Sequence, residues 1–186
     1  SGGLLAGLMT HGIGLPPLMA LGSEDLKQRV APDVIAGKPL IALCVTEPSG
    51  GADVANIRTR ARRDGGDFII DGEKTYITTG CRADWLTVAV RTGGPGAAGL
   101  SFLLVDAQSP GVTRTKLDKM GWWMSDTASI SFSGVRTPAE NLIGAENAGF
   151  AGVVANFNAE RQSMAAQARA FSRVGIEDAA GGARVR

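Results

Sequence analysis

Residues 43–53, Leu-Cys-Val-Thr-Glu-Pro-Ser-Gly-Gly-Ala-Asp, constrain the fold of this chain more than any other stretch. An apolar run that ends in Thr46 and Pro48 is typical of a buried strand that leads into a loop, because proline disfavours a helical conformation in the residue before it. Gly50 and Gly51 then allow backbone paths that bulkier residues cannot follow. Backbone N–H groups exposed in such a bend can bind phosphate.

A second strand-like run, residues 74–80, places an aromatic ring between hydroxyl groups in the sequence Lys-Thr-Tyr-Ile-Thr-Thr-Gly. Together the two segments can hold a flat heterocycle that carries a pyrophosphate tail. Taken alone, each segment is more often ordinary β structure with a few threonines. Both interpretations stay open on these residues.

The composition is that of a globular protein. The chain has 186 residues, 44% of them hydrophobic, which is enough for one or two domains with a core. Its net charge of +1 gives no reason to expect nucleic acid or an anionic membrane as partner. No apolar run reaches the roughly 18 residues of a membrane span.

Residues 1–8 lack the basic start of a signal peptide, so we expect a cytoplasmic location. Cys44 and Cys81 lie far from any Cys/His cluster, which predicts free thiols and no metal site.

The hydrophobic period predicts a helix on either side of a long β-rich region. Residues 23–36 begin with Ser23 as N-cap and continue with apolar positions at helical spacing, until Gly37 and Pro39 end the helix. After residue 147 the helical period returns.

Between the helices, short β-rich runs alternate with turns. The expected strands are residues 40–46, 57–63, 68–70, 74–78, 85–91, 100–105, 112–116 and 128–132, with turns at 64–67 and 71–72. Strands at this spacing suggest a closed or nearly closed antiparallel β-barrel. We therefore predict an α+β fold, with a barrel-like domain at 40–145 between helical segments at 1–39 and 146–186.

Residues 94–99, Gly-Pro-Gly-Ala-Ala-Gly, satisfy the dinucleotide-binding pattern G-x-G-x-x-G. They lie between two predicted strands and open no helix, which that pattern requires. We predict a flexible hairpin loop there.

The two segments at 43–53 and 74–80 resemble the acyl-CoA dehydrogenase family of flavoenzymes, whose middle β-domain carries V-T-E-P-x-x-G-S-D and then a W-I-T-like motif. The resemblance continues in order over about residues 21–170. It includes Gly-Glu-Lys at 72–74, Ser-Phe-Leu-Leu-Val at 101–105, Pro-Gly at 110–111, Met-Gly-Trp-Trp-Met-Ser-Asp-Thr at 120–127, Pro-Ala-Glu-Asn-Leu-Ile-Gly at 138–144 and Asn-Ala-Gly-Phe at 147–150. It implies FAD as cofactor and, in fatty acid or lipid metabolism, oxidation of an acyl-CoA thioester to the trans-2-enoyl product.

The resemblance also implies the binding residues. The hydroxyl of Thr46 would reach a flavin ring nitrogen, Tyr76 would stack on the isoalloxazine in place of the family's tryptophan, and Thr78 would lie near N5. The full set of implied flavin contacts is Val45, Thr46, Gly51, Ala52, Tyr76, Ile77 and Thr78. Ala52 replaces the family's serine and keeps only the backbone contribution. The implied contacts along the substrate and CoA path are Ala52, Phe157, Asn158 and Arg161.

Glu160 is the candidate catalytic base. Val153, Phe157 and Glu160 are spaced by four and three residues, which places the carboxylate at the edge of an apolar helix face. Met164 continues this face. A glutamate beside Arg161 can also be a structural ion pair. In the isovaleryl and long-chain types of the family, the catalytic carboxylate lies on this helix directly before an arginine, so the resemblance implies that Glu160 removes the α-proton of the substrate.

Such a base needs a raised pKa. A free glutamate has a pKa of about 4.3, too low to abstract the α-proton of a thioester, so we expect burial to raise it.

Two hypotheses follow from the resemblance. The first is an FAD-dependent acyl-CoA dehydrogenase that passes electrons to an electron-transfer flavoprotein and forms a homotetramer or homodimer. An acyl-CoA oxidase would use the same fold. The second is a truncated, non-catalytic module that binds flavin or CoA weakly or serves as a scaffold. The second hypothesis is based on the length of the chain, which is too short to contain both the complete N-terminal helical domain and the C-terminal four-helix domain of family members. Beyond about residue 171 the glycine-containing tail does not resemble the family, and glycine is a poor helix former.

Overall fold

The computed structural model describes Ala6, Met9 and residues 11–185, so part of the predicted helical segment 1–39 lies outside the described residues. Within the described chain, contacts define two units, one that ends at Val153 and one that begins at Val154. The domain limits predicted from the sequence remain a prediction.

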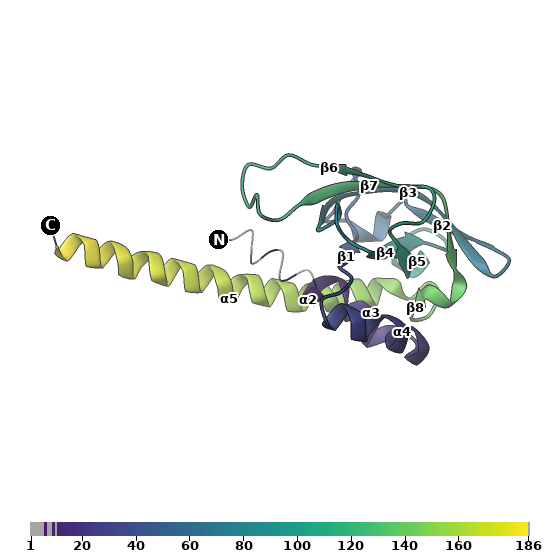
Figure 1. Cartoon of the computed structure of the whole chain (residues 1–186), viewed down its shortest axis with the longest axis horizontal. Helices are drawn as coiled ribbons and strands as arrows, with labels where there is room; N and C mark the ends of the chain where they lie inside the picture. The colour runs from purple at the N-terminus through teal and green to yellow at the C-terminus, as the bar shows by residue number, and fades with distance from the viewer. Residues whose placement is uncertain (1–5, 7–8, 10, 186) are drawn as a thin grey trace. The chain divides into compact units, whose positions relative to one another are not determined.

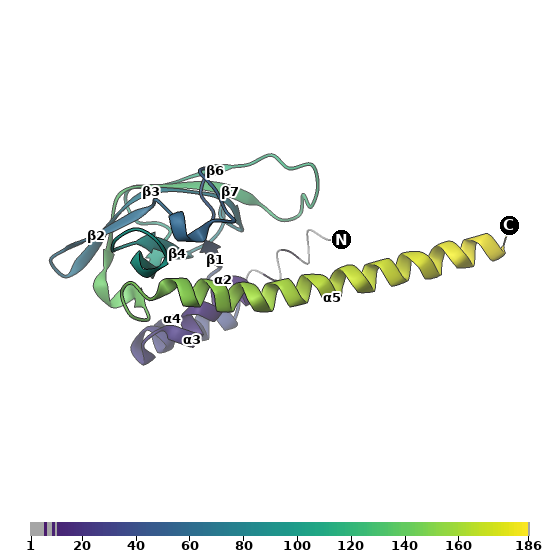
Figure 2. The same ribbon diagram turned by 180° about the vertical axis from the view of Figure 1, so that it is seen from behind.

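Among the described residues of the first unit, three helices precede the sheet, and Figures 1 and 2 show them together on one side of it. Their bounds are α2 (His11–Gly14), α3 (Pro16–Leu21) and α4 (Glu24–Ile35). The predicted helix 23–36 is confirmed as α4, and its N-cap is confirmed because Ser23 Oγ accepts a hydrogen bond from Leu26 N at 3.2 Å. Val30 and Val34 are buried with Leu26 on the inner face. Helix α2 lies against the sheet, where Thr87 Oγ1 donates to Gly14 O at 2.8 Å.

The strands follow the predicted order closely. Their bounds are β1 (Ile41–Cys44), β2 (Arg60–Asp64), β3 (Asp67–Thr78), β4 (Trp85–Arg91), β5 (Leu100–Asp106), β6 (Val112–Lys116), β7 (Thr127–Pro138) and β8 (Leu142–Ile143). Single 3₁₀ turns form at η1 (Val54–Asn56), η2 (Ala97–Gly99) and η3 (Ala139–Asn141). The loop at 92–99 connects the antiparallel strands β4 and β5, which confirms the hairpin interpretation of the G-x-G-x-x-G match.

The sheet has the strand order β6-β7-β3-β2-β4-β5-β8, with β1 paired to β4. The α+β class is confirmed. The strands are mixed in direction, because β1 and β2 both pair in parallel with β4. Among the strands of the described residues, β6 and β8 are the two ends of this order and do not pair, so the sheet is not closed into a barrel.

Strand β3 is longer than predicted. The sequence signal at residues 71–72 indicated a turn, but β3 continues through it with a register shift between Ile70 and Gly72. A Cβ on Gly72 would lie 2.6 Å from Thr59 Cα, so glycine serves here as a bulge residue at a close backbone approach. A second shift falls between Lys74 and Ile77.

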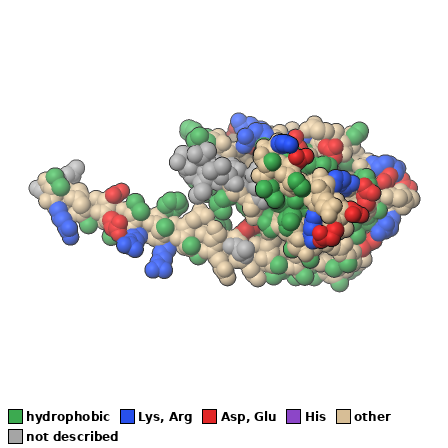
Figure 3. Space-filling model, turned by 60° about the horizontal axis from the view of Figure 1, so that its bottom comes forward, with side chains coloured by type: hydrophobic (Ala, Val, Ile, Leu, Met, Phe, Trp, Pro, Cys, Tyr) green, Lys and Arg blue, Asp and Glu red, His purple; other side chains and the backbone are tan. Residues whose placement is uncertain are grey.

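The core of the first unit lies within the sheet. It consists of residues from nearly every strand, among them Ala42, Cys44, Ala61, Phe68, Ile70, Ile77, Leu86, Val88, Val90, Leu103, Val105, Ala128, Ile130, Phe132 and Val135. Both cysteines are free, as predicted, and burial raises the pKa of Cys44 to about 12. Outside the core, basic and acidic side chains are interspersed on the face shown in Figure 3, in keeping with the small net charge.

Helix α5 (Gly149–Arg184) confirms the helix predicted after residue 147. It continues through Gly175, Gly181 and Gly182, although glycine disfavours helix. Met164 is 64% exposed, so the predicted apolar face is not covered at that position. Within the described part of the chain, no helix is both long and apolar enough to span a membrane.

Candidate functional site

The two motif segments that stood out in the sequence lie side by side at one end of β1. Thr75 N donates to Thr46 O at 2.9 Å and joins the loop after β1 to β3. Gly51 folds back over Thr46, since a Cβ on Gly51 would lie 3.0 Å from Thr46 Cγ2. A tight turn closes the loop, with reciprocal backbone hydrogen bonds between Glu47 and Gly50. The structure therefore brings the first predicted contact segment against the second.

A buried ion pair holds this junction in place. Lys74 is fully buried, Glu47 is 4% exposed, and Lys74 Nζ lies 2.9 Å from Glu47 Oε1. Lys74 Nζ also donates to Val45 O at 3.0 Å. The carboxylate of Glu47 accepts from Arg58 N at 2.7 Å and Thr59 N at 2.9 Å. One pair of side chains thus connects the loop, β3 and the chain entering β2.

The pKa values of this pair reflect burial and mutual attraction. Burial raises the pKa of Glu47, but Lys74 and the hydrogen bonds from Thr59 and Arg58 outweigh it and hold the pKa below its ordinary value. Burial lowers the pKa of Lys74, and Glu47 partly offsets that effect. The pair is a structural feature with well-satisfied partners.

Tyr76 stands out from β3. It adopts a left-handed backbone conformation with φ of 59° at the second register shift, and its side chain is 71% exposed. A non-glycine residue with positive φ is uncommon, and such strain clusters at functional sites. The side chain of Ile77 points into the core, and Val45 is also buried. Thr78 is half-buried at the end of the strand.

Ala52 is exposed in the loop after β1, and the other predicted residues lie on α5, in the second unit. Asn156 Nδ2 donates to Glu160 Oε1, and Arg161 lies 5.8 Å from the ring centre of Phe157. Burial raises the pKa of Glu160 above its ordinary value, while Arg161 and the hydrogen bond from Asn156 act in the opposite direction. Asn158 is exposed. The expected rise in the Glu160 pKa is therefore present in the structure.

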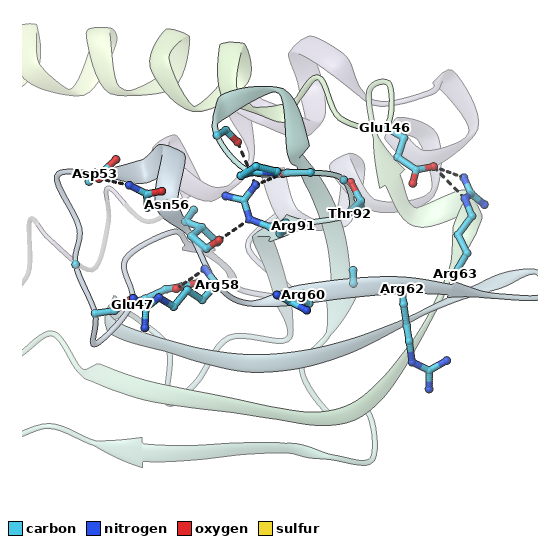
Figure 4. Close-up of a pocket in the computed structure, with 18 residues that line it drawn as sticks. Glu47, Asp53, Asn56, Arg58, Arg60, Arg62, Arg63, Arg91, Thr92 and Glu146 are labelled. Atoms are coloured by element: carbon cyan, nitrogen blue, oxygen red, sulfur yellow. Dashed lines mark hydrogen bonds and ion pairs between the residues drawn. The ribbon is translucent and has the colours of Figure 1, made fainter.

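A pocket of about 1230 Å³ lies between the loop after β1, the start of β2 and the loop after β4. Figure 4 shows its arginine-rich lining, which includes Arg58, Arg60, Arg62, Arg63 and Arg91. Arg63 forms an ion pair with Glu146 at 2.8 Å. Glu47 and Gly50 also line the pocket, so the motif loop forms part of its wall.

Sequence reasoning missed the buried ion pair and the arginine pocket. The partners Glu47 and Lys74 are 27 residues apart, and only their presence in the two motif segments could have linked them. The arginines carried a clearer signal. Arg58, Arg60 and Arg62 alternate around the small residue Ala61 in a predicted strand, a pattern that places the charges together on one face.

Within the described residues, no group of three or more His, Cys, Asp or Glu side chains is placed to hold a metal ion. The chemistry of the two motif segments is instead that of hydroxyl groups, backbone amides and one aromatic ring.

Comparison with known protein families shows the family to which the chain belongs. The family model described as "Acyl-CoA dehydrogenase, middle domain" matches residues 42–135, about half of the chain. This chain belongs to the acyl-CoA dehydrogenase family. The match runs from β1 into β7, so it contains both motif segments, the buried ion pair and most of the arginine pocket. Glu160 lies outside the matched range.

Individual acyl-CoA dehydrogenases agree with this assignment. The acyl-CoA dehydrogenase apdG of Emericella nidulans is 41% identical over 182 residues, which are 96% of this chain and 41% of the relative. The cyclohexane-1-carbonyl-CoA dehydrogenase of Geobacter metallireducens is 41% identical over 162 residues, 87% of this chain and 43% of the relative. The crystal structure of a probable acyl CoA dehydrogenase from Mycobacterium abscessus has a TM-score of 0.85 and 54% identity, and covers 87% of this chain and 43% of that chain. The chain therefore spans about two fifths of the length of these acyl-CoA dehydrogenases.

Proposed function

We propose that this chain is the flavin-binding part of an FAD-dependent acyl-CoA dehydrogenase, which converts an acyl-CoA thioester to the trans-2-enoyl-CoA. One observation carries the proposal. The loop that contains Thr46 and Gly51 lies against the bulge of β3, where a left-handed backbone presents the exposed ring of Tyr76. An exposed aromatic ring in a segment that also carries hydroxyl groups suits a flat heterocycle.

The residues of this junction fit FAD in different ways. Tyr76 offers a stacking surface, and Thr46 and Thr78 offer hydroxyl groups to the ring. Val45 and Ile77 are buried, so their contribution is through the backbone. Gly51 is half-buried and Ala52 is exposed, and their contribution would come from the backbone amides. FAD, when bound, supplies the acceptor for the β-hydride of the substrate.

Glu160 is the proposed base for the α-proton. A carboxylate whose pKa is raised by burial holds a proton more tightly and is the better base. Its hydrogen bond from Asn156 fixes the orientation of the carboxylate on α5. Phe157, Asn158 and Arg161, together with Ala52, would line the path of the acyl-CoA.

The proposal extends to the biological setting of the whole protein. We propose that the protein acts in fatty acid metabolism in the cytoplasm, as a homodimer or homotetramer, and passes electrons to an electron-transfer flavoprotein. An acyl-CoA oxidase would instead pass them to oxygen, and rapid reoxidation of the reduced flavin by air would identify it.

The first test concerns the cofactor. FAD is titrated into the purified chain while the flavin absorption bands are followed. Tyr76→Ala should weaken FAD binding by about 0.5 to 1.5 kcal/mol beyond the loss of buried area, because a stacking surface is removed. Tyr76→Phe is the matched control and should bind FAD as the parent does. A parent chain that leaves the FAD spectrum unchanged would support the non-catalytic remnant.

The second test concerns the base. In the full-length, FAD-loaded protein, Glu160→Gln should slow flavin bleaching by acyl-CoA about a hundredfold or more, the usual scale for loss of a positioned base. In the parent, the rate should rise with pH through the Glu160 pKa, which burial raises above the ordinary value of a glutamate, because only the deprotonated carboxylate accepts the proton. Glu177→Gln on the same helix is the control, since Glu177 is exposed and paired with Arg173. Bleaching at the parent rate in Glu160→Gln would show that another group is the base.

A further inference from the structure

Lys74 is bound to the backbone of the first motif segment at the place where the proposed flavin contacts begin. Its Nζ donates to Val45 O at 3.0 Å and lies 2.9 Å from Glu47 Oε1. The next carbonyl along the segment, Thr46 O, accepts a hydrogen bond from Thr75 N at 2.9 Å. Two consecutive peptide groups of the loop are therefore held by two consecutive residues of β3.

The N–H edges of these two peptide groups point the opposite way, because the N–H and C=O of a trans peptide lie on opposite sides. Glu47 N–H, which belongs to the second group, donates to Gly50 O at 3.1 Å in the tight turn. Thr46 N–H, which belongs to the first, has no hydrogen-bond acceptor among the described residues, and Thr46 is only half-buried. Lys74 thus fixes the direction of a peptide N–H that remains free for a ligand.

The backbone of Lys74 has a second role, at the start of the bulge in β3. Lys74 is in register with Ile130 of β7, and the register shifts between Lys74 and Ile77. Tyr76, with its positive φ and its exposed ring, lies within this shift. One residue therefore connects the direction of Thr46 N–H with the segment that presents the tyrosine ring.

Stability of the core alone does not explain a charged pair at this position. An apolar pair of similar volume is often as stable as a buried ion pair or more stable, because no charge has to be removed from water. An apolar side chain at position 74 would, however, have no donor for Val45 O. What the lysine provides beyond packing is a hydrogen bond in one fixed direction.

We propose that the Glu47–Lys74 pair positions the flavin ring. This inference rests on the proposed function. Lys74 holds the Val45–Thr46 peptide so that Thr46 N–H is presented to the ring, and Glu47 holds the ammonium group of Lys74. A donor that is fixed before the ligand arrives costs less conformational entropy on binding than a mobile donor. Both side chains are buried, so they act through the backbone and are positioning residues.

The test compares two variants of the full-length protein that differ only in the amine of Lys74. In E47Q, the amide oxygen can still accept from Lys74, and the hydrogen bond to Val45 O is kept. E47Q/K74M also lacks that hydrogen bond. In FAD titrations we expect E47Q to bind nearly as the parent does. We expect E47Q/K74M to bind about 10–100-fold more weakly, the scale on which metal sites lose affinity when a residue behind a direct ligand is removed.

Stability changes in the opposite direction in this comparison. E47Q leaves the amine of Lys74 buried without its carboxylate, whereas methionine at position 74 buries no charge, so E47Q/K74M should be at least as stable as E47Q. Weaker FAD binding by the double variant is therefore not explained by loss of the fold. Thermal melts check this order, and if E47Q does not fold, E47Q/K74M is compared with the parent.

The spectrum of bound flavin distinguishes positioning from a general structural role. With protein in excess all FAD is bound, so visible absorption and circular dichroism report the surroundings of the ring. We expect both spectra to differ from the parent in E47Q/K74M and to match the parent in E47Q. Val30→Ala is the destabilised control, because Val30 is buried on α4 and belongs to neither motif segment. It should leave FAD affinity and both spectra unchanged.

Two results would overturn the inference. One is equal FAD affinity in the folded variants E47Q and E47Q/K74M, or in E47Q/K74M and the parent. The other is weaker binding by E47Q/K74M with an unchanged spectrum of the bound flavin. The proposed function fails separately, through a parent protein that does not bind FAD. A parent that binds FAD, with no difference between the variants, refutes the positioning role alone.

Discussion

Two groups of charges, one of which reaches the pocket only through Glu47, are built in opposite ways. Glu47 and Lys74 are buried, lie 2.9 Å apart and have additional hydrogen bonds to backbone groups. Arg58, Arg60 and Arg62 are exposed and have no side-chain partner among the described residues. A buried charge without a partner is strongly destabilising, whereas an exposed arginine is solvated by water. The difference indicates that the first group supports the fold, whereas the fold does not depend on a partner for the second.

The strongest test of this comparison is the removal of Lys74. Lys74→Met leaves the carboxylate of Glu47 buried without its cation, and we expect a loss of about 3–5 kcal/mol in the free energy of unfolding. The double variant E47L/K74M should recover a large part of this loss, because it removes the unpaired charge. Urea denaturation followed by circular dichroism measures both values.

The control for this test is Arg173→Gln, which breaks an exposed ion pair on α5 and should cost less than about 1 kcal/mol. If Lys74→Met cost as little as the control, the buried pair would not support the junction between the loop and β3.

A smaller effect is expected where the arginine pocket meets its loop. A Cβ on Gly99 would lie 1.9 Å from Gly94 O and 2.8 Å from Arg91 Nη1. Gly99→Ala should therefore displace the loop and cost about 1–3 kcal/mol, the usual scale for overpacking. Gly94→Ala in the same loop meets no atom within 4 Å and should change stability by less than about 0.5 kcal/mol. Thermal unfolding of the two variants side by side measures the difference, and equal melting temperatures would contradict it.

The smallest effect is expected for the unpaired arginines themselves. Arg62→Gln removes an exposed charge without a partner, so the free energy of unfolding should change by no more than about 0.5 kcal/mol. A larger loss in urea denaturation would show that Arg62 supports the fold, and the contrast between the two groups of charges would then be wrong.

The local structure was largely predictable from the sequence, because it depends on near neighbours. The turn at 64–67 was predicted from its Asp-Gly-Gly-Asp sequence, and Gly65 has the positive φ of 62° that such a turn requires. The signal at 71–72 was the same in kind but marks a bulge within β3. A turn and a bulge both use glycine. Gly72 differs from Gly65 because Thr59, the residue directly before β2, lies close to it, and this contact cannot be read from the local sequence.

The site was predictable only in part, for a related reason. The resemblance located the loop around Thr46 and the run around Tyr76, and the structure places these segments together. The pairing of Glu47 with Lys74 is a long-range contact, which no local pattern encodes. Similarly, the alternation of arginines in β2 predicts a charged face, but which of them lack an acidic partner depends on the fold of residues as distant as Glu146.

The order of strands in the sheet has a consequence for how the chain folds. Ile41 pairs with Trp85, and Asp67 pairs with Pro138, so the central ladders join residues far apart in the sequence. Long loops must close before these contacts form, and topologies of high contact order fold in milliseconds to seconds. During synthesis, β3 emerges well before β7 and its edge stays unpaired in the interval. We therefore expect this chain to fold slowly and to be most prone to aggregation while β7 is still missing.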